Sequence, residues 1–287
     1  GLVRGIIVPR EVETCTLDLM RAAAEAASER KMPVAIHAAY NIHEVFDIIR
    51  EHQMTSVELL EAVGLMSDML NIGHGNFTAD NPLMNYSGAS DLELMGRYRC
   101  SISHCPVNVA RRGRFLDSWQ SYKRAGVNIA LGTDTYPRDM MLQMRNASYM
   151  GKIASRNLKA ATAGEVFEAA TLNGARSLGR DDIGRLAPGA RADIVIIDLT
   201  GRDSLRYGPI RDPIKSLIDC GIGDDVDTVI VDGVVRMEGG RIPGVDFAAL
   251  RQQAQAAGER IWSGWANWDS LGRTADEMSP YTFPRAN

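Results

Sequence analysis

Short apolar runs alternate with amphipathic stretches over roughly the first 180 residues of the chain. Each run fits a short buried strand bounded by polar or turn-forming residues. Between the runs, apolar residues recur at the spacing of a helix with one buried face. This alternation predicts an α/β fold with parallel strands. The predicted strands end near residues 9, 37, 74, 104 and 131, and the predicted helices cover residues 16–30, 42–51, 57–63, 90–98, 116–125 and 163–178.

The pattern changes after residue 182, where short strands are joined by glycine and proline turns. This texture predicts a small unit of β-structure followed by one helix and an extended, aromatic-rich tail. We therefore expect three parts, residues 1–182, 183–243 and 244–287. The expected strands of the second part are residues 192–199, 226–231 and 234–238, the expected helix covers residues 247–262, and the tail is residues 265–287.

Four polar residues stand where the predicted strands end. His37, His74 and His104 close three of the runs, and Asp134 follows the fourth after a glycine, at intervals of 37, 30 and 30 residues. A strand, a crossover helix and two loops need roughly 30 residues, so the four side chains should meet at one edge of the sheet. A single such histidine is more often structural, and Gly-Thr-Asp alone can be a turn with a helix cap. The repetition favours a site, and three imidazoles with one carboxylate suit zinc or iron.

Composition narrows the class of protein. With 45% hydrophobic and 24% charged residues, a chain of 287 residues can bury a full core. The formal net charge of −4 and the lack of a basic cluster argue against nucleic acid or an anionic membrane as a partner. Four cysteines without CxxC spacing predict reduced thiols and a cytoplasmic location. Cys105, beside His104, has the alternatives of a nucleophile and a small buried residue, and we favour the second.

The residues at the strand ends resemble those of a known protein family. His37-Ala-Ala, Gly73-His74-Gly75, the segment Ser103-His-Cys-Pro-Val-Asn108 and Gly132-Thr-Asp134 resemble strands five to eight of the amidohydrolase superfamily, in its cytosine deaminase-like and triazine hydrolase (chlorohydrolase)-like branch. Residues 170–175, 184–193 and 231–233 are similar to that family's C-terminal signature, so the resemblance covers most of residues 1–243. It implies a TIM-type (β/α)8 barrel, of which this chain holds the C-terminal strands, about 4 to 8, plus a small β-sandwich portion.

The resemblance also implies an activity and a site. The expected reaction is hydrolysis of a C–N or C–heteroatom bond in a small, cyclic nitrogenous substrate by a metal-activated water. One divalent metal, zinc before iron, would be bound by His37 and Asp134. Asp134 would also accept a proton from the water, and His74 would orient the hydroxide or stabilise developing charge; a role for His74 as a ligand of a second metal is the lesser case. The substrate pocket would be lined by three further residues, Tyr40, His104 and Asn108.

The sequence departs from the family pattern in two ways. It has no His-x-His pair, which the family carries on the first barrel strand, and too few strands for a barrel. We therefore expect a fragment whose missing strands come from an absent N-terminal region or a partner chain, with a homo-oligomer as the assembled form. Tyr40 also stands where deaminase relatives have a glutamate, and a phenol with a pKa near about 10 is a poor substitute.

Two alternatives stay open at this point. A catalytically silent, amidohydrolase-like binding or scaffold subunit would explain both departures, although His37, His74 and Asp134 argue against it. A barrel enzyme acting on a phosphorylated metabolite should carry a glycine-rich phosphate loop, and residues 133–138 are not glycine-rich.

Overall fold

The computed structural model describes residues 2–200 and 205–283. The chain divides into two compact units, Gly1–Gly240 and Arg241–Asn287, which we describe separately. The sequence-based division after residues 182 and 243 stays a prediction.

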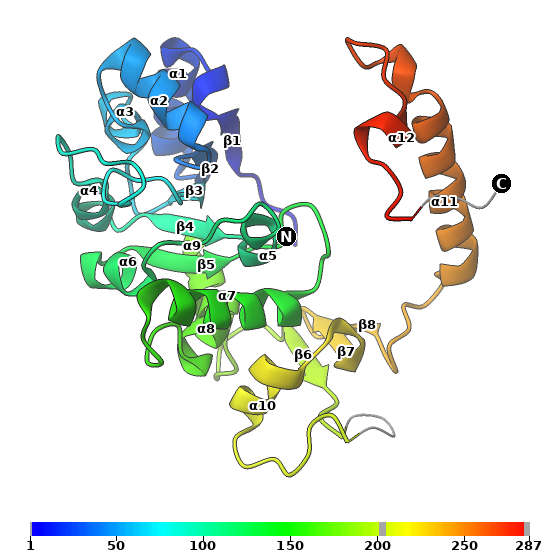
Figure 1. Cartoon of the computed structure of the whole chain (residues 1–287). Helices are drawn as coiled ribbons and strands as arrows, with labels where there is room; N and C mark the ends of the chain where they lie inside the picture. The colour runs from blue at the N-terminus through cyan, green and yellow to red at the C-terminus, as the bar shows by residue number, and fades with distance from the viewer. Residues whose placement is uncertain (1, 201–204, 284–287) are drawn as a thin grey trace. The chain divides into compact units, whose positions relative to one another are not determined.

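The first unit is built on a five-stranded parallel sheet with the order β1-β2-β3-β4-β5 (Figure 1). All five strands lie where the apolar runs predict them, and the α/β class is confirmed. Figure 1 shows α1 beside β1 and α6 and α8 beside β5. The strands are β1 (Ile7–Glu11), β2 (Val34–Ala38), β3 (Leu70–His74), β4 (Ser101–His104) and β5 (Asn128–Leu131). The helices are α1 (Leu17–Arg30), α2 (Ile42–His52), α3 (Ser56–Ala62), α4 (Asp91–Arg97), α5 (Pro106–Ala110), α6 (Trp119–Ala125), α7 (Met140–Ser155), α8 (Ala163–Ala170) and α9 (Leu172–Ser177), and the short 3-10 turn η1 (Val12–Thr14) follows β1.

Helix boundaries follow from local capping chemistry. Thr55 starts α3 with a reciprocal capping box, and Asp139 starts α7 by accepting hydrogen bonds from two backbone amides of the first turn. The single helix expected over residues 163–178 is wrong in one respect, because the chain breaks at Thr171 into α8 and α9. Thr171 has φ −126° and ψ −90°, and its hydroxyl donates to the carbonyl oxygen of Phe167 at 2.8 Å.

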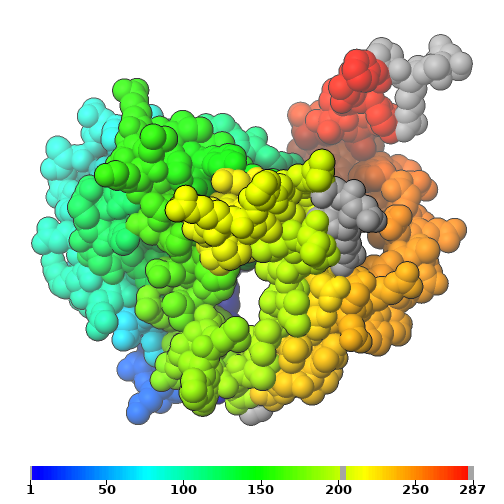
Figure 2. Space-filling view, turned by 90° about the horizontal axis from the view of Figure 1, so that it is seen from below, coloured from blue at the N-terminus to red at the C-terminus, as the bar shows by residue number. Residues whose placement is uncertain are grey.

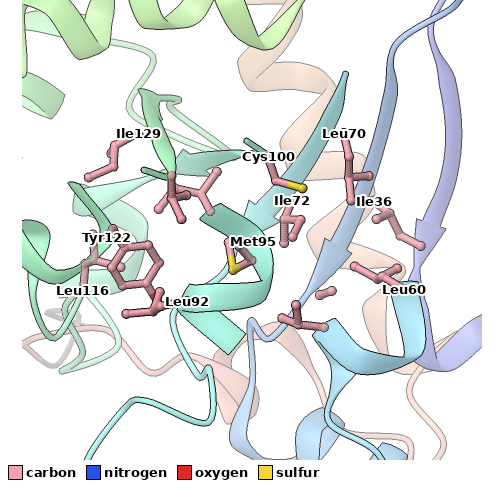
Figure 3. Close-up of a cluster of buried hydrophobic side chains, with 14 of the residues drawn as sticks. Ile36, Leu60, Leu70, Ile72, Leu92, Met95, Cys100, Leu116, Tyr122 and Ile129 are labelled. Carbon is pink, nitrogen blue, oxygen red and sulfur yellow. The ribbon is translucent and has the colours of Figure 1, made fainter. Parts of the chain in front are cut away.

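One face of the sheet packs against helices and forms the core (Figure 3). Ile36, Leu70 and Ile72 point from the strands toward Leu60 of α3 and Met95 of α4, and all five side chains are almost fully buried. Burying each such side chain contributes about 1.5–3 kcal/mol to the free energy of unfolding. The alternation of side chains along each strand places the intervening residues, such as His37 after Ile36, on the opposite face of the sheet.

The opposite face is polar and internally hydrogen-bonded. Ser103 donates to the side chain of Asn71 at 3.0 Å, and the Asn128 amide donates to Ser101 at 3.0 Å. Ser103 pairs in register with Gly73 of β3, and Gly73 pairs with His37 of β2. His37 therefore belongs to this polar face, at the carboxyl end of its strand.

Both outer edges of the sheet are irregular. Asn128 donates its backbone amide to Cys100 on the β4 side, so the backbone groups of Ile129 point to the outer edge of β5. There the Asn173 side chain from α9 donates to the Ile129 carbonyl oxygen at 3.0 Å. At the other edge, β1 contains Pro9, which has no N–H, and a register shift between Ile7 and Arg10.

The remainder of the first unit contains a three-stranded antiparallel sheet, β6 (Ile194–Ile197), β7 (Val226–Val231) and β8 (Val234–Met237), in the order β6-β7-β8. The three strands agree with the predicted ones; a β-sandwich stays a prediction. The sequence reading missed α10 (Pro213–Cys220), which begins with an Asp212 cap and a proline in the first turn, and the 3-10 turn η2 (Gly223–Asp225) that follows it. Figure 2 shows α10, in yellow, against the green helices, in agreement with its contacts to α7 and α8.

The second unit contains α11 (Phe247–Ser263), the 3-10 turn η3 (Trp265–Asn267) and α12 (Ala275–Met278). The predicted helix is confirmed as α11, which starts at the Asp246 cap. The tail was predicted as an extended arm, but its described part, residues 265–283, folds locally: Asp269 binds Arg273 at 2.8 Å and Thr274 forms a capping box with Glu277. Residues 284–287 of the predicted tail lie outside the described residues. Across the described residues, none of the helices combines the length and the apolar character needed to cross a membrane.

Candidate functional site

The ends of β2 and β3 bring His37 and His74 together. Their rings are stacked, with centroids 5.5 Å apart and planes inclined by 24°. Gly73, the partner of His37 in the strand register, makes room for this arrangement. A Cβ atom at Gly73 would lie 2.7 Å from Cδ2 of His37, so any larger residue would displace the imidazole.

Asp134 lies beside His74 in the loop after β5. Oδ2 of Asp134 is 3.7 Å from Nε2 of His74, and it accepts a hydrogen bond from the side-chain amide of Asn108 on α5. Both His74, with φ 72°, and Asp134, with φ 54°, have left-handed backbone conformations that non-glycine residues rarely adopt. Three of the predicted site residues, His74, Asn108 and Asp134, therefore meet directly.

Hydrogen bonding orients the His37 ring, and burial shifts the pKa of His74. Nδ1 of His37 lies 3.0 Å from the carbonyl oxygen of Arg10, which can only accept, so Nδ1 is the donor in this hydrogen bond. Burial lowers the pKa of His74, and the nearby Asp134 carboxylate only partly opposes this effect. His74 is therefore a neutral imidazole at neutral pH.

Tyr40 completes this group at the end of β2. Its ring centroid is 6.2 Å from that of His37 and 6.0 Å from that of His74. Its hydroxyl donates a hydrogen bond to the carboxylate of Glu13 in η1. Burial, followed by the Glu13 hydrogen bond, raises the pKa of Tyr40 above its usual value, so the phenol remains protonated.

His104 lies deeper than the other predicted site residues. Its ring packs edge-on against Trp119 with ring centroids 6.4 Å apart, and only 2% of the residue is exposed. Its Nδ1 atom is buried and has no hydrogen-bond partner among the described residues. Burial lowers the pKa of His104 to about 3, so its imidazole is neutral. Contact with substrate stays a prediction for His104. For Cys105, burial raises the pKa of the thiol to about 12, which fits the small buried residue rather than the nucleophile.

The residues of the site offer part of a metal-binding set. His37 has the arrangement common to metal-binding histidines, because its Nδ1 bonds a carbonyl oxygen while, in the part of the chain that the structure describes, no hydrogen bond uses its Nε2. Imidazole and carboxylate are suitable ligands for zinc. Among residues 2–200 and 205–283, however, no group of three or more His, Cys, Asp or Glu side chains is placed to hold an ion. A catalytic zinc site has three protein ligands, so this set is the right kind of donor but is incomplete.

A cavity of about 730 Å³ lies elsewhere in the first unit. It is lined by residues at the amino ends of β4 and β5, among them Ser101 and Asn128, together with charged residues of α8 and α9. None of the six predicted site residues lines it. The strand-end cluster, rather than this cavity, holds the residues with the relevant chemistry.

Two acidic residues near the site, Glu13 and Glu44, were not predicted from the sequence. Glu13 lies two residues beyond the end of β1, close to the strand-end position that singled out the histidines. Glu44 lies on α2 at a core-facing position, next to the buried Val45 and one turn before the buried Ile48. A buried acid within an apolar helical stripe is a usable signal, because such a carboxyl needs several hydrogen-bond partners.

The Glu44 carboxylate holds the loop that carries Tyr40. It accepts hydrogen bonds from the backbone amides of Ala39 at 3.3 Å and Tyr40 at 3.1 Å, and from the hydroxyl of Ser56. The residue is 3% exposed. Burial raises the pKa of Glu44 from 4.5 to about 7, despite the opposing effect of these hydrogen bonds.

The raised pKa predicts a pH-dependent stability. Between about pH 4.5 and 7 the folded chain binds the Glu44 proton more tightly than the unfolded chain, so the free energy of unfolding should fall as pH rises through this range. At about 1.4 kcal/mol per pKa unit, the loss is on the order of 3 kcal/mol. Urea unfolding at a series of pH values should show a flatter profile for Glu44→Gln. Glu51→Gln, which changes an exposed carboxyl on the same helix, should keep the wild-type slope; an unchanged slope in Glu44→Gln would contradict the assignment.

Comparison with known proteins places this chain among enzymes of one family. A 5-methylthioadenosine/S-adenosylhomocysteine deaminase of Halobacterium salinarum is 31% identical over 258 residues, which are 88% of this chain and 57% of the relative. A 5'-deoxyadenosine deaminase of Methanosphaera stadtmanae is 27% identical over 265 residues, which are 91% of this chain and 59% of the relative. The chain thus spans a little over half the length of these curated relatives.

Solved structures agree with this placement. An adenosine deaminase of Xanthomonas campestris with bound zinc has a TM-score of 0.79 at 26% identity, over 89% of this chain and 57% of its own. A mutant of the atrazine chlorohydrolase TrzN of Arthrobacter aurescens, complexed with zinc and atraton, has a TM-score of 0.77 at 24% identity, over 88% of this chain and 54% of its own, which shows the fold alone. The sequence model of the amidohydrolase family matches residues 1–236. With well over half of its residues matched, the chain belongs to the amidohydrolase family.

Proposed function

We propose that this chain carries part of the active site of a metal-dependent hydrolase that cleaves a C–N bond of a small, cyclic nitrogenous substrate. The observation that carries the proposal is the meeting of His37, His74 and Asp134 at the ends of three parallel strands. The deaminase names of the relatives support an adenosine-type nucleoside as the substrate class. The proposed fold of the complete enzyme is a (β/α)8 barrel, to which this chain contributes the five parallel strands.

The proposed metal is one zinc ion, with Nε2 of His37 and the Asp134 carboxylate as its ligands from this chain. The zinc bound in the related adenosine deaminase structure supports this identity over iron. The remaining ligands must come from residues outside those described, because the described residues form no complete set. Bound zinc would lower the pKa of a water ligand to about 7.

The residues of this chain have separate tasks in the proposed reaction. Asp134 accepts the proton of the attacking water at its carboxylate, and the Asn108 amide keeps that carboxylate oriented. His74 is a neutral imidazole beside Asp134, and it hydrogen-bonds the group on which charge develops. Tyr40 forms the wall of the site next to both histidine rings.

Metal content tests the proposal. The 287-residue chain and the longest polypeptide that its source encodes should be compared by elemental analysis after purification without chelator. We expect about one zinc per molecule in the longer polypeptide, lost in His37→Ala and kept in His43→Ala, which changes an exposed histidine on α2. Adenosine hydrolysis should be lost in His37→Ala, which loses zinc, and kept in His43→Ala, which keeps it.

A second candidate is a catalytically silent binding or scaffold subunit. The incomplete donor set among the described residues favours it. The same measurement separates the two candidates, because a protein without zinc in either polypeptide, and without hydrolysis of adenosine, would leave the silent subunit as the better description.

A further inference from the structure

An exposed carboxylate stands at the rim of the site. Glu13 lies in η1, directly after β1, and is exposed to solvent. Glu11, the last residue of β1, pairs in register with His37 of β2. Because parallel strands end at the same edge of the sheet, Glu13 emerges at the end of the sheet where His37 and Tyr40 lie.

The position of Glu13 is fixed through Tyr40. The Tyr40 hydroxyl donates to Oε1 of Glu13, and the Tyr40 ring is held near the rings of His37 and His74. The backbone below Tyr40 is itself fixed, because the buried Glu44 carboxylate accepts hydrogen bonds from the amides of residues 39 and 40. Hydrogen bonds through Tyr40 thus connect the buried Glu44 carboxylate to the exposed Glu13 carboxylate.

One oxygen of Glu13 remains open for a ligand. Within the part of the chain that the structure describes, Tyr40 is the hydrogen-bond donor to Glu13, and this bond uses Oε1. Arg10, the nearby cation, is bonded to Glu11 instead, at 3.1 Å. Oε2 is therefore left as an acceptor on the carboxylate that Tyr40 holds, and the Tyr40 ring lies next to both histidine rings.

We propose that Glu13, held in place by Tyr40, is a substrate-binding residue that accepts a hydrogen bond from an N–H group of the substrate. The site then prefers a nitrogenous ring that carries an amino group to the same ring without one. Glu13 touches the substrate, and Tyr40 is a positioning residue that acts through Glu13. This inference rests on the proposed function and names a recognition group that it requires.

The test uses a matched pair of nucleosides, adenosine and purine riboside, which differ by one amino group. Dissociation constants are measured by titration calorimetry on the longest polypeptide that the source encodes, after removal of metal, so that binding is read without turnover. A hydrogen bond to a charged group corresponds to about a 10- to 100-fold change in affinity. Glu13→Gln should weaken adenosine by at least about tenfold and leave purine riboside unchanged.

Three further variants complete the design. Tyr40→Phe should reduce the preference for adenosine by a smaller factor, because Glu13 remains but loses its fixed position. The double variant should behave as Glu13→Gln alone, since the Tyr40 hydroxyl acts only through Glu13 and phenylalanine keeps the ring. Glu25→Gln, which changes an exposed carboxyl on α1, should keep the wild-type preference.

The possible outcomes separate this inference from the proposed function. If Glu13→Gln keeps the wild-type ratio of the two affinities, or weakens both nucleosides equally, the role of Glu13 is overturned and the hydrolase proposal stands. If the wild-type protein neither binds nor hydrolyses adenosine, the proposed substrate class fails and the role of Glu13 fails with it. A selective loss of adenosine binding in Glu13→Gln supports both the role of Glu13 and the proposed substrate class.

Discussion

Replacing Asp134 by asparagine should lower kcat/KM for adenosine hydrolysis by about 10²- to 10⁴-fold in the polypeptide that carries the complete site. The substitution keeps the shape of the side chain but removes the carboxylate that the proposed reaction needs as a proton acceptor. It also places an amide opposite the amide of Asn108, which now donates to Asp134. Steady-state kinetics at fixed zinc concentration measures the effect.

A matched control distinguishes loss of chemistry from loss of fold. Asp68→Asn removes an exposed carboxylate before the amino end of β3, the opposite end of the strand from His74. It should leave kcat/KM within about a factor of two. An Asp134→Asn enzyme with wild-type kcat/KM would show that Asp134 is not the proton acceptor.

Gly96→Ala should destabilise the first unit by about 3 kcal/mol or more. Gly96 lies in α4 where this helix packs against α6, and a Cβ atom there would be 1.7 Å from the backbone oxygen of Ala125. A backbone atom cannot turn aside as a flexible side chain can, so the two helices would have to separate. Urea unfolding of the 287-residue chain, followed by circular dichroism, measures the loss.

The control for this prediction is another helical glycine. Gly164 lies near the start of α8, is exposed, and has open space where its Cβ would be. Gly164→Ala should raise the free energy of unfolding by about 0.5–1 kcal/mol, because alanine restricts the unfolded chain and favours a helix. Equal effects of the two substitutions would contradict the close contact between α4 and α6.

The sequence predicted the strands and the residues at their ends because both follow from a repeated pattern. Each buried strand is a short apolar run, and a polar residue at its end stands out against that run, as His37, His74 and Asp134 do. The contacts among His74, Asn108 and Asp134 depend on two left-handed backbone positions and on α5, and periodicity does not encode these features. Their roles in catalysis and metal binding stay predictions.

Features that depend on contacts between distant segments were missed. Glu13 and Tyr40 are 27 residues apart, and only the neighbouring placement of β1 and β2 brings them together. The break at Thr171 was also missed, since the sequence on both sides is helix-forming and one threonine hydroxyl marks the change. The α10 helix had ordinary start signals in Asp212 and Pro213, but the surrounding strand and turn pattern obscured them.

The irregular edges of the parallel sheet have a consequence for the behaviour of the protein in concentrated solution. An exposed strand edge can act as a template on which other chains add strands and begin to aggregate. Here Pro9 and the register shift interrupt the row of backbone groups along β1, and the Asn173 side chain occupies the Ile129 carbonyl oxygen on β5. Colliding molecules therefore meet interrupted edges, which slows the growth of intermolecular sheets.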